Sequence, residues 1–426
     1  MIIKNLFKHF PSYPHYKMNV FSGTNSFREI KSVLNFKLGN NQYIKEYEKI
    51  ISKTINSRYI FTFASGRMGF YAILKAINIQ KYDEVIIPSF TCVVVSNAIL
   101  YHGAKPVYCE IKNDDYNIDV SKIEELITSK TKVIYAQHTF GQMCDINSIQ
   151  ELAKKYKLIV VEDAAGALGS KQGKQYAGTI GDFGYFSTDR TKVINTGLGG
   201  IVSVNNEKYI KSFKENYTNT PFFRSDLTKK ISKTFVLNVI TLNPHVYWLG
   251  KFINLILSKF KMMTYLLDET LIKKEHIINY PYPARLSSIF AKLGISQFKS
   301  LKDNLNNRKK IAMFYNETLK IYSEDYMKSD KNIFLRYSFL VKNRDYWENK
   351  FSSKIDLSIW FKTIAYGRKS NFEEINYKVG SNKISEKVCK NIFNLPTHNQ
   401  IKTEKLKSLL SELKNSADII TKENIL

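Results

Sequence analysis

The chain has 426 residues, of which 44% are hydrophobic, and this is enough to bury a large core and to form more than one domain. Its formal net charge of +26 would suit nucleic acid, an anionic membrane surface or phosphorylated substrates, but the absence of zinc-finger, basic-zipper and RNP-like motifs argues against nucleic acid. Four cysteines without CxxC spacing, and no signal-peptide pattern, predict reduced thiols in a cytoplasmic protein without a structural metal.

Residues 1–40 mix aromatic, basic and turn-forming residues without a sustained period, and we interpret them as an N-terminal extension. A large domain is predicted over 41–204. It starts with helical spacing over 43–55, and a short apolar strand follows over 59–63.

This strand ends at Ser65, and a second helical pattern begins at once, over 68–77. The first-turn amides of a helix have no intrahelical partner, so a strand, a glycine turn and a helix start together favour an anion. The amides of Gly66 and Arg67 are therefore candidate anion ligands, to which the Arg67 guanidinium can add a charged contact. A plain strand-to-helix turn is the alternative.

Strands and helices then alternate, which predicts a mostly parallel sheet with active groups at the carboxyl ends of its strands. The next strand ends at 87 and leads through Phe90 and Cys92 into a helix, and another strand ends at His138. His138 is a candidate for a contact near a ligand or for a structural hydrogen bond. The predicted strands cover 85–87, 105–111 and 132–137, and a helix is predicted over 118–127.

Most of the candidate chemistry lies between residues 158 and 202. An apolar run ends at Glu162 and Asp163, which is typical of a buried strand that presents a carboxylate at its end, and Ser187 and Lys192 follow before three glycines. This order suits pyridoxal 5′-phosphate (PLP). The lysine forms a Schiff base with its aldehyde, the aspartate keeps the pyridine nitrogen protonated and the serine helps to hold the phosphate.

The chain resembles the DegT/StrS family of PLP-dependent sugar aminotransferases, which carry an EDAAQ-like strand end and an FSF-x-x-x-K-x-x-x-x-G-x-GG-like segment. Here EDAAG spans 162–166 and FSTDRTKVINTGLGG spans 186–200. The resemblance implies that Lys192 is the Schiff-base lysine and Asp163 the partner of the pyridine nitrogen, and these two are the candidate catalytic residues. It implies that Ser187 binds the phosphate.

Two more segments correspond to family motifs, and one position departs from the family. Ser65-Gly66-Arg67 stands at the family's SGT, which implies that Gly66 and Arg67 bind the cofactor phosphate, and His138 lies in an HLYGQ-like turn near the cofactor. Cys92 occupies a position where the family often has an aromatic ring that stacks on the pyridine. Phe90 or another group is therefore expected to cover that face.

The pattern departs from the family over 205–280, which we interpret as an apolar and basic helical insertion. Residues 234–250 carry no Lys, Arg, Asp or Glu, but Asn238 and Pro244 interrupt this run and disfavour a membrane-spanning helix. Two interpretations remain. The apolar faces pack within a dimer or over the substrate cleft, or residues 232–266 contact the inner face of a membrane with lysines at anionic head groups.

Resemblance resumes at residue 282, with Gln297 and Arg308 in the expected places, and predicts a C-terminal small domain over 281–426. The elements expected there are a long helix over 290–319, a strand over 335–342, an NLP-like segment over 391–398 and an amphipathic helix over 402–413.

The resemblance as a whole implies a fold type I transferase, with a mostly parallel α/β large domain and a smaller α+β domain. It implies an aminotransferase that acts as a homodimer and moves an amino group, with glutamate as the expected donor, to a keto-sugar. That sugar is expected to be nucleotide-linked and destined for cell-surface glycans. The alternative is a catalytically degenerate PLP-binding protein that acts as a regulator or scaffold.

Overall fold

The computed structural model describes residues 30, 31, 33, 41–260, 262–264, 282–368 and 370–420. Nearly all of the predicted N-terminal extension, 1–40, and the last part of the predicted insertion lie outside these residues. The chain forms two hydrophobic cores, one around a seven-stranded sheet and one around a three-stranded sheet.

The large sheet has the order β1-β9-β8-β5-β4-β2-β3. The pairs from β8 to β3 are parallel, while β9 runs antiparallel to both β8 and β1, so a single strand is reversed. The mostly parallel α/β class is thus confirmed. Its strands are β1 Ile60–Phe63, β2 Glu84–Pro88, β3 Lys105–Cys109, β4 Thr131–Gln137, β5 Ile159–Asp163, β8 Phe183–Ser187 and β9 Gly200–Val204.

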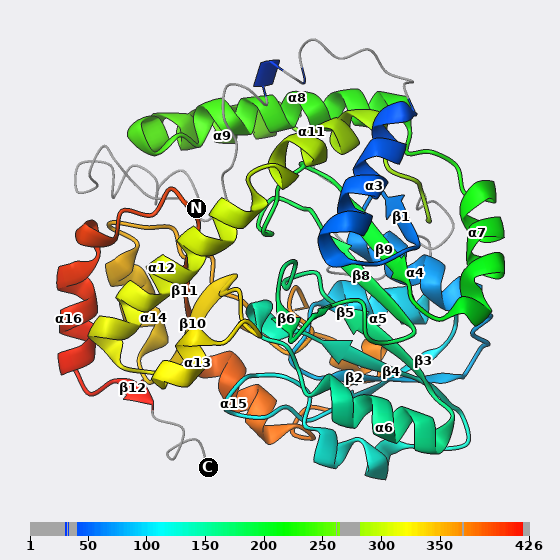
Figure 1. The fold of residues 1–426 in the computed structure, drawn as a ribbon. Coiled ribbons are helices and arrows are strands. Elements are labelled where there is room, and N and C mark those ends of the chain that lie inside the picture. Colours follow the sequence, from blue (N-terminus) through cyan, green and yellow to red (C-terminus); the bar gives the residue numbers. More distant parts are fainter. Residues whose placement is uncertain are drawn as a thin grey trace.

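Helices pack on this sheet as the alternating pattern predicts, and their apolar faces supply the first core (Figure 1). They are α3 Gln42–Ile55, α4 Gly66–Ala76, α5 Val93–Leu100, α6 Ile146–Tyr156, α7 Ile210–Asn219 and α11 Ser288–Phe298. A short hairpin, β6 Lys171–Gln172 and β7 Gln175–Tyr176, lies between β5 and β8 in sequence.

The predicted helix over 118–127 is wrong. The structure has two 3-10 turns there, η2 Val120–Lys122 and η3 Glu124–Leu126. Ile123 is the only residue buried within 120–127, so the segment has no apolar stripe that could hold an α-helix against the sheet.

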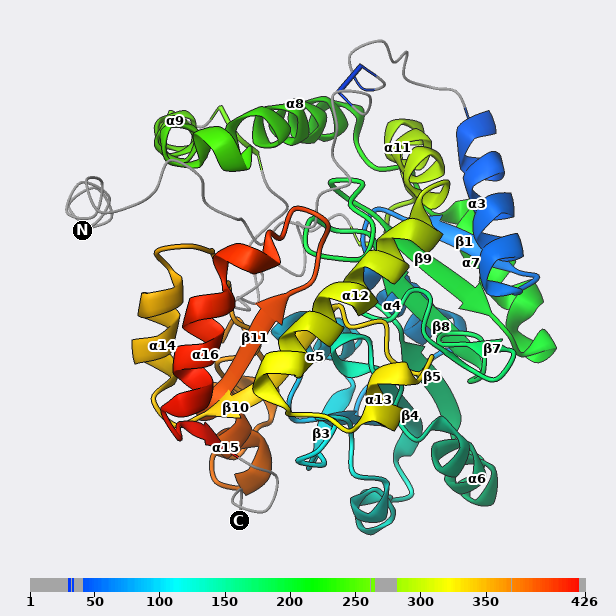
Figure 2. The ribbon, with the colours of Figure 1, turned by 60° about the vertical axis from the view of Figure 1, so that its left-hand side comes forward.

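The smaller unit contains an antiparallel sheet of order β11-β10-β12, with β10 Arg336–Val341, β11 Ile392–Pro396 and β12 Ile419–Ile420. Helices cover it, as the α+β interpretation predicted (Figure 2). They are α12 Leu301–Leu319, α13 Glu324–Lys328, α14 Arg344–Phe351, α15 Lys383–Asn391 and α16 Lys407–Asn415.

The single long helix predicted over 290–319 is two helices, α11 and α12, which are separated at Lys299 and Ser300. The two helices serve different cores, because α11 packs against α3 whereas α12 packs against α16. Leu301 still belongs to the first core and Ile311 to the second. We therefore propose that the small domain begins within α12.

The predicted insertion contains a helical hairpin formed by α8 Ser225–Thr241 and α9 Tyr247–Lys259, joined through the 3-10 turn η6 Pro244–Val246. Gly250 permits its close packing, since a Cβ atom there would lie 1.5 Å from the Thr241 carbonyl oxygen. Figures 1 and 2 both place the hairpin along one side of the molecule, beyond α11 and α12. Within the described ranges no helix combines the length and the hydropathy needed to cross a membrane.

Candidate active site

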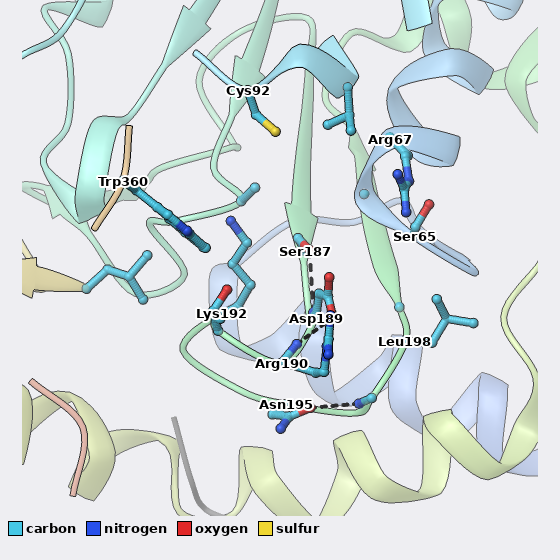
Figure 3. A pocket seen from close by; sticks show the side chains of 18 of the residues that line it. Ser65, Arg67, Cys92, Ser187, Asp189, Arg190, Lys192, Asn195, Leu198 and Trp360 are labelled. Atoms are coloured by element: carbon cyan, nitrogen blue, oxygen red, sulfur yellow. Dashed lines mark hydrogen bonds and ion pairs between the residues drawn. The ribbon is translucent and has the colours of Figure 1, made fainter. Parts of the chain in front are cut away.

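A cavity of about 390 Å³ opens at the carboxyl ends of β5 and β8 (Figure 3). Large-domain strand ends and loops line it together with a small-domain loop and α8. Every residue that the sequence predicted for catalysis or cofactor binding lines this cavity, namely Gly66, Arg67, His138, Asp163, Ser187 and Lys192.

Asp163 ends β5 and is held by two hydrogen bonds. Its Oδ2 accepts one from the Tyr135 hydroxyl at 2.6 Å, and its Oδ1 accepts one from the Ala165 amide at 2.8 Å. The Tyr135 hydroxyl also contacts that of Tyr185, and burial raises the pKa of both tyrosines well above the ordinary value, so both stay protonated donors. The parallel register aligns Asp163 with Tyr185 on β8, and this brings the carboxylate and the phenols together.

The start of α4 forms an anion cradle beside β8. Ser65 is the N-cap residue and accepts a hydrogen bond from the Met68 amide at 3.3 Å, which leaves the preceding first-turn amides for a ligand. Gly66 brings the helix close to Ser187, because a Cβ atom on Gly66 would lie 3.2 Å from the Ser187 Cβ. Gly200 is equally constrained, since its added Cβ would come within 2.3 Å of the Ser65 backbone.

Lys192 lies on a loop between β8 and β9 that closes on itself. The Thr188 amide donates to the Gly199 carbonyl at 3.0 Å, and the Thr196 amide donates to the Thr188 carbonyl at 2.9 Å. The lysine side chain projects from this closed loop into the cavity (Figure 3).

Two helices anchor the same loop from outside. Gln297 on α11 accepts from the Asn195 amide at 2.8 Å and donates back to the Asn195 carbonyl, while Asn304 on α12 donates to the Val193 carbonyl at 2.7 Å. The sequence resemblance marked Gln297 by position, and its role as a loop anchor is visible only in the structure.

Burial lowers the pKa of Lys192, while Asp163, Cys92 and Asp189 act in the opposite direction. Its Nζ atom lies 4.9 Å from the centre of the Trp360 ring, and the Arg336 guanidinium lies 4.4 Å from the centre of that ring. A buried lysine with a lowered pKa has more of the neutral amine that attacks an aldehyde.

His138 connects the ends of β4 and β5. Its Nδ1 accepts from the Cys144 amide at 3.2 Å, so Nε2 carries the ring proton and lies 2.9 Å from a Glu162 carboxylate oxygen. The His138 amide also donates to the Asp163 carbonyl at 3.0 Å. These contacts hold the strand end that carries Asp163.

Of the two options that the sequence left open, Phe90 or another group, the structure excludes Phe90 from the cavity surface. Phe90 is fully buried and belongs to the second core, where it packs against Phe140 and Phe361, and it is not among the residues that line the cavity. The small domain instead contributes Trp360, Phe361 and Tyr366. Cys92 faces the cavity, and its Sγ lies 3.6 Å from the Tyr366 carbonyl oxygen.

Helix α8 closes another side of the cavity. Its residues Ile231, Phe235 and Val239 recur at helical spacing and line the cavity together with Asn238 and with Leu242, the residue that caps the helix. Phe235 also packs against the loop of residues 188–199 that carries Lys192, which we call the lysine loop. Its ring lies so close to Gly197 that a Cβ atom added there would be 3.1 Å away. The inner face of α8 therefore packs over the cleft, as one of the two interpretations of the insertion predicted.

This two-domain α/β architecture, with functional side chains at the carboxyl edge of a mostly parallel sheet, is that of the fold type I transferases. The chain belongs to the DegT/DnrJ/EryC1/StrS aminotransferase family, whose model matches residues 23–230 and 261–414.

Individual relatives cover different shares of the chain. GDP-perosamine synthase of Escherichia coli O157:H7 is 40% identical over 165 residues, which is 39% of this chain and 45% of that protein, so the chain matches less than half of its length. A pleiotropic regulatory protein of Geobacillus stearothermophilus is 24% identical over 87% of this chain and 88% of its own. The crystal structure of NtdA from Bacillus subtilis with bound cofactor PMP superimposes with a TM-score of 0.67 at 20% identity, over 92% of this chain and 83% of that one.

Proposed function

We propose that this protein is a PLP-dependent aminotransferase that transfers an amino group from an amino acid to a keto group of a nucleotide-linked sugar. One observation carries the proposal. Lys192, Asp163 and the α4 cradle with Ser187 line a single cavity. An amine, a carboxylate and an anion site are the three groups that PLP needs from a protein, so the donor set fits this cofactor.

When bound, PLP supplies an electron-accepting ring. The Asp163 carboxylate, oriented by Tyr135, would hold a proton on the pyridine nitrogen. Ser187 and the amides of Gly66 and Arg67 would hold the phosphate. The Lys192 amine would first bond to the cofactor and then, once released, move a proton at the substrate carbon as base and acid. His138 would keep the end of β5 in place through Glu162.

The relatives support the substrate class. GDP-perosamine synthase and a dTDP-3-amino-3,6-dideoxy-alpha-D-galactopyranose transaminase are named for nucleotide-linked amino sugars, and they are 40% and 39% identical over the matched stretches. By this analogy the acceptor is a nucleotide-linked keto-sugar for a surface glycan, and the donor is glutamate. A homodimer, and a peripheral membrane contact through residues 232–266, complete the proposal.

Borohydride reduction of cofactor-loaded protein, followed by peptide mass mapping, tests the assignment. The expected result is a cofactor label on the peptide that contains Lys192. The matched control is Lys192→Arg, which keeps the charge but cannot be labelled. A label elsewhere, or no label on protein that retains PLP, would overturn the assignment.

The second candidate is a PLP-binding regulator without turnover. It is favoured by the long alignment with a pleiotropic regulatory protein and by Cys92 at the position of the usual aromatic ring. Adding glutamate separates the two functions. An aminotransferase loses its visible cofactor absorbance with glutamate and regains it with a keto-sugar from a nucleotide-linked panel, whereas a regulator leaves the absorbance unchanged.

A further inference from the structure

The hairpin formed by α8 and α9 includes the one internal stretch that the family model leaves unmatched, residues 231–260. The inner face of α8 closes the cavity, as described above. The outer side of the hairpin is not explained by the proposed reaction. In Figures 1 and 2 the short described helical fragment around residue 30 lies outside α8, and no other described helix or strand lies outside α9.

An apolar row runs along the outside of α9. It starts at Val246, just before α9, and ends at Phe260, just after it. The residues recur after three, four, three and four positions, so the members within α9 share one face of the helix. Their exposed fractions are 46% for Val246, 58% for Leu249, 37% for Ile253, 39% for Ile256 and 70% for Phe260. We name these five residues the α9 stripe. Single exposed apolar residues are normal, but a continuous row marks a binding surface.

The inner side of α9 is fixed, so the stripe cannot turn inward. The Tyr247 hydroxyl donates to the Asp356 carboxylate at 2.6 Å, and Lys251 reaches the same oxygen at 3.3 Å. The Thr241 hydroxyl donates to Asn254 at 2.8 Å, and the close approach at Gly250 joins α9 to α8. The surface is thus presented on a rigid support.

The exposed charges of the hairpin are mostly basic. Lys229, Lys230 and Lys233 are exposed on α8, and Lys259 is exposed at the end of α9. The acidic residue of the hairpin, Asp226, forms an ion pair with Arg224 at 2.8 Å, which cancels its charge locally. Ile240, half exposed on α8, extends the apolar surface.

We propose that the α9 stripe and the α8 lysines bind an anionic phospholipid surface, with α9 lying in the plane of the interface. A helix with an apolar face and neighbouring lysines binds there because its apolar side chains enter the acyl boundary while the lysines meet the head groups. A second copy of the hairpin would bring two sets of lysines together, and their repulsion disfavours it as the occupant. The cavity behind α8 would then lie close to the bilayer. This inference rests on the membrane contact of the proposed function and assigns it to named residues and to one lipid class.

Sedimentation with phosphatidylcholine vesicles, with and without phosphatidylglycerol, tests this surface. The wild type should sediment only with vesicles that contain phosphatidylglycerol, and added salt should weaken the binding. Replacing Leu249, Ile253 and Ile256 together by serine should lower the partition coefficient by about tenfold or more. Replacing Lys229, Lys230 and Lys233 by glutamine should lower it by about fivefold for each lysine.

The matched control is Val379→Ser. Val379 is 67% exposed but lies outside the hairpin, so this variant should bind as the wild type does. Equal binding by the stripe variant, equal binding to vesicles without phosphatidylglycerol, or no binding by the wild type would each overturn the proposal. A stripe variant whose mass in solution falls below that of the wild type would also overturn it, because the stripe would then join two copies.

Borohydride labelling of Lys192 in the same preparations separates this proposal from the proposed function. The stripe variant should keep its thermal midpoint and its label, because the stripe residues are exposed and none of them lines the cavity that contains Lys192. If the wild type is labelled at Lys192 but does not sediment with vesicles, only the proposal of a membrane-binding surface is refuted. A wild type that binds vesicles but takes no label refutes the aminotransferase alone.

Discussion

Glu162 illustrates, at the scale of one residue, how the strand end with Asp163 is fixed. Its buried carboxylate accepts hydrogen bonds from four donors. The amides of Ile180 and Gly181 reach Oε1, each at 2.6 Å, while the Gly178 amide and the His138 ring lie 2.9 Å from Oε2. Each oxygen accepts two hydrogen bonds from the protein, so the buried carboxylate is fully hydrogen-bonded.

Glu162→Gln should therefore be strongly destabilising although it preserves shape. The glutamine NH₂ group would replace an oxygen that accepts from two donors, and donor would then face donor. We expect a loss of about 2–4 kcal/mol in the free energy of unfolding, measured by urea denaturation. Glu124→Gln is the control, because Glu124 meets Lys155 at the surface, and it should leave the urea midpoint unchanged. Equal midpoints for the two variants would contradict the role given to Glu162.

Lys192 provides a prediction about pH. Burial lowers its pKa below the ordinary lysine value of 10.5, so the neutral amine becomes available at lower pH than on a surface lysine. The rate of covalent PLP attachment, followed by borohydride trapping, should rise with pH and level off at a pH below 10.5. Free Nα-acetyl-lysine treated in the same way is the reference for an unburied amine. Attachment to Lys192 that follows the same pH curve as this reference would contradict the burial effect.

The sequence could predict some site residues but not others. Asp163, Ser187 and Lys192 follow apolar runs or precede glycine turns, so order alone marks them. Tyr135 and Tyr185 lie within strands, where a buried tyrosine has the same pattern as a core residue. Their contacts with Asp163 depend on which strands are neighbours, and one sequence does not contain that information.

At the scale of elements, glycines decide how closely segments approach. The closely spaced glycines of the lysine loop predict turns. Gly250 lies within an apolar run, and the sequence there does not predict a close contact between two helices. In the structure it is a point of close approach between α9 and α8. Likewise, the sequence does not predict the break between α11 and α12. Phe298 and Leu301 lie on either side of the break and both belong to the first core, so the apolar pattern continues across it.

Gly250→Ala should loosen the hairpin. The new Cβ atom would meet the Thr241 carbonyl at 1.5 Å, a distance that only separation of the helices can relieve. We expect faster amide hydrogen exchange in α8 and α9 and unchanged exchange in the large sheet. Gly294→Ala is the matched control, because its Cβ would clash with Tyr47 and should affect α11 and α3 instead. The same exchange pattern in both variants would contradict a local hairpin contact.

At the scale of the whole molecule, the cavity is shared by the two domains. Lys192 comes from the large domain, whereas Trp360 comes from a small-domain loop that is held in place by Asn394, whose side-chain oxygen accepts from the Trp360 amide at 2.7 Å. This loop has neither helical nor strand periodicity, so the sequence could not connect it with a lysine more than 160 residues earlier. The fold class was predictable from alternation and resemblance, but the pairing of these two surfaces was not.

The distance across this domain junction gives the last prediction. The chain has three tryptophans, and Trp360 has its ring centre 4.9 Å from the Lys192 amine, whereas Trp347 lies in the small-domain core and donates to Asp418. A cofactor joined to Lys192 should therefore quench Trp360 more strongly than the others. Trp360→Phe should abolish most of the fall in tryptophan emission that accompanies PLP loading, and Trp347→Phe should preserve it. If Trp360→Phe quenches like the wild type while Lys192 is labelled, the two domains do not meet around the cofactor as this cavity requires.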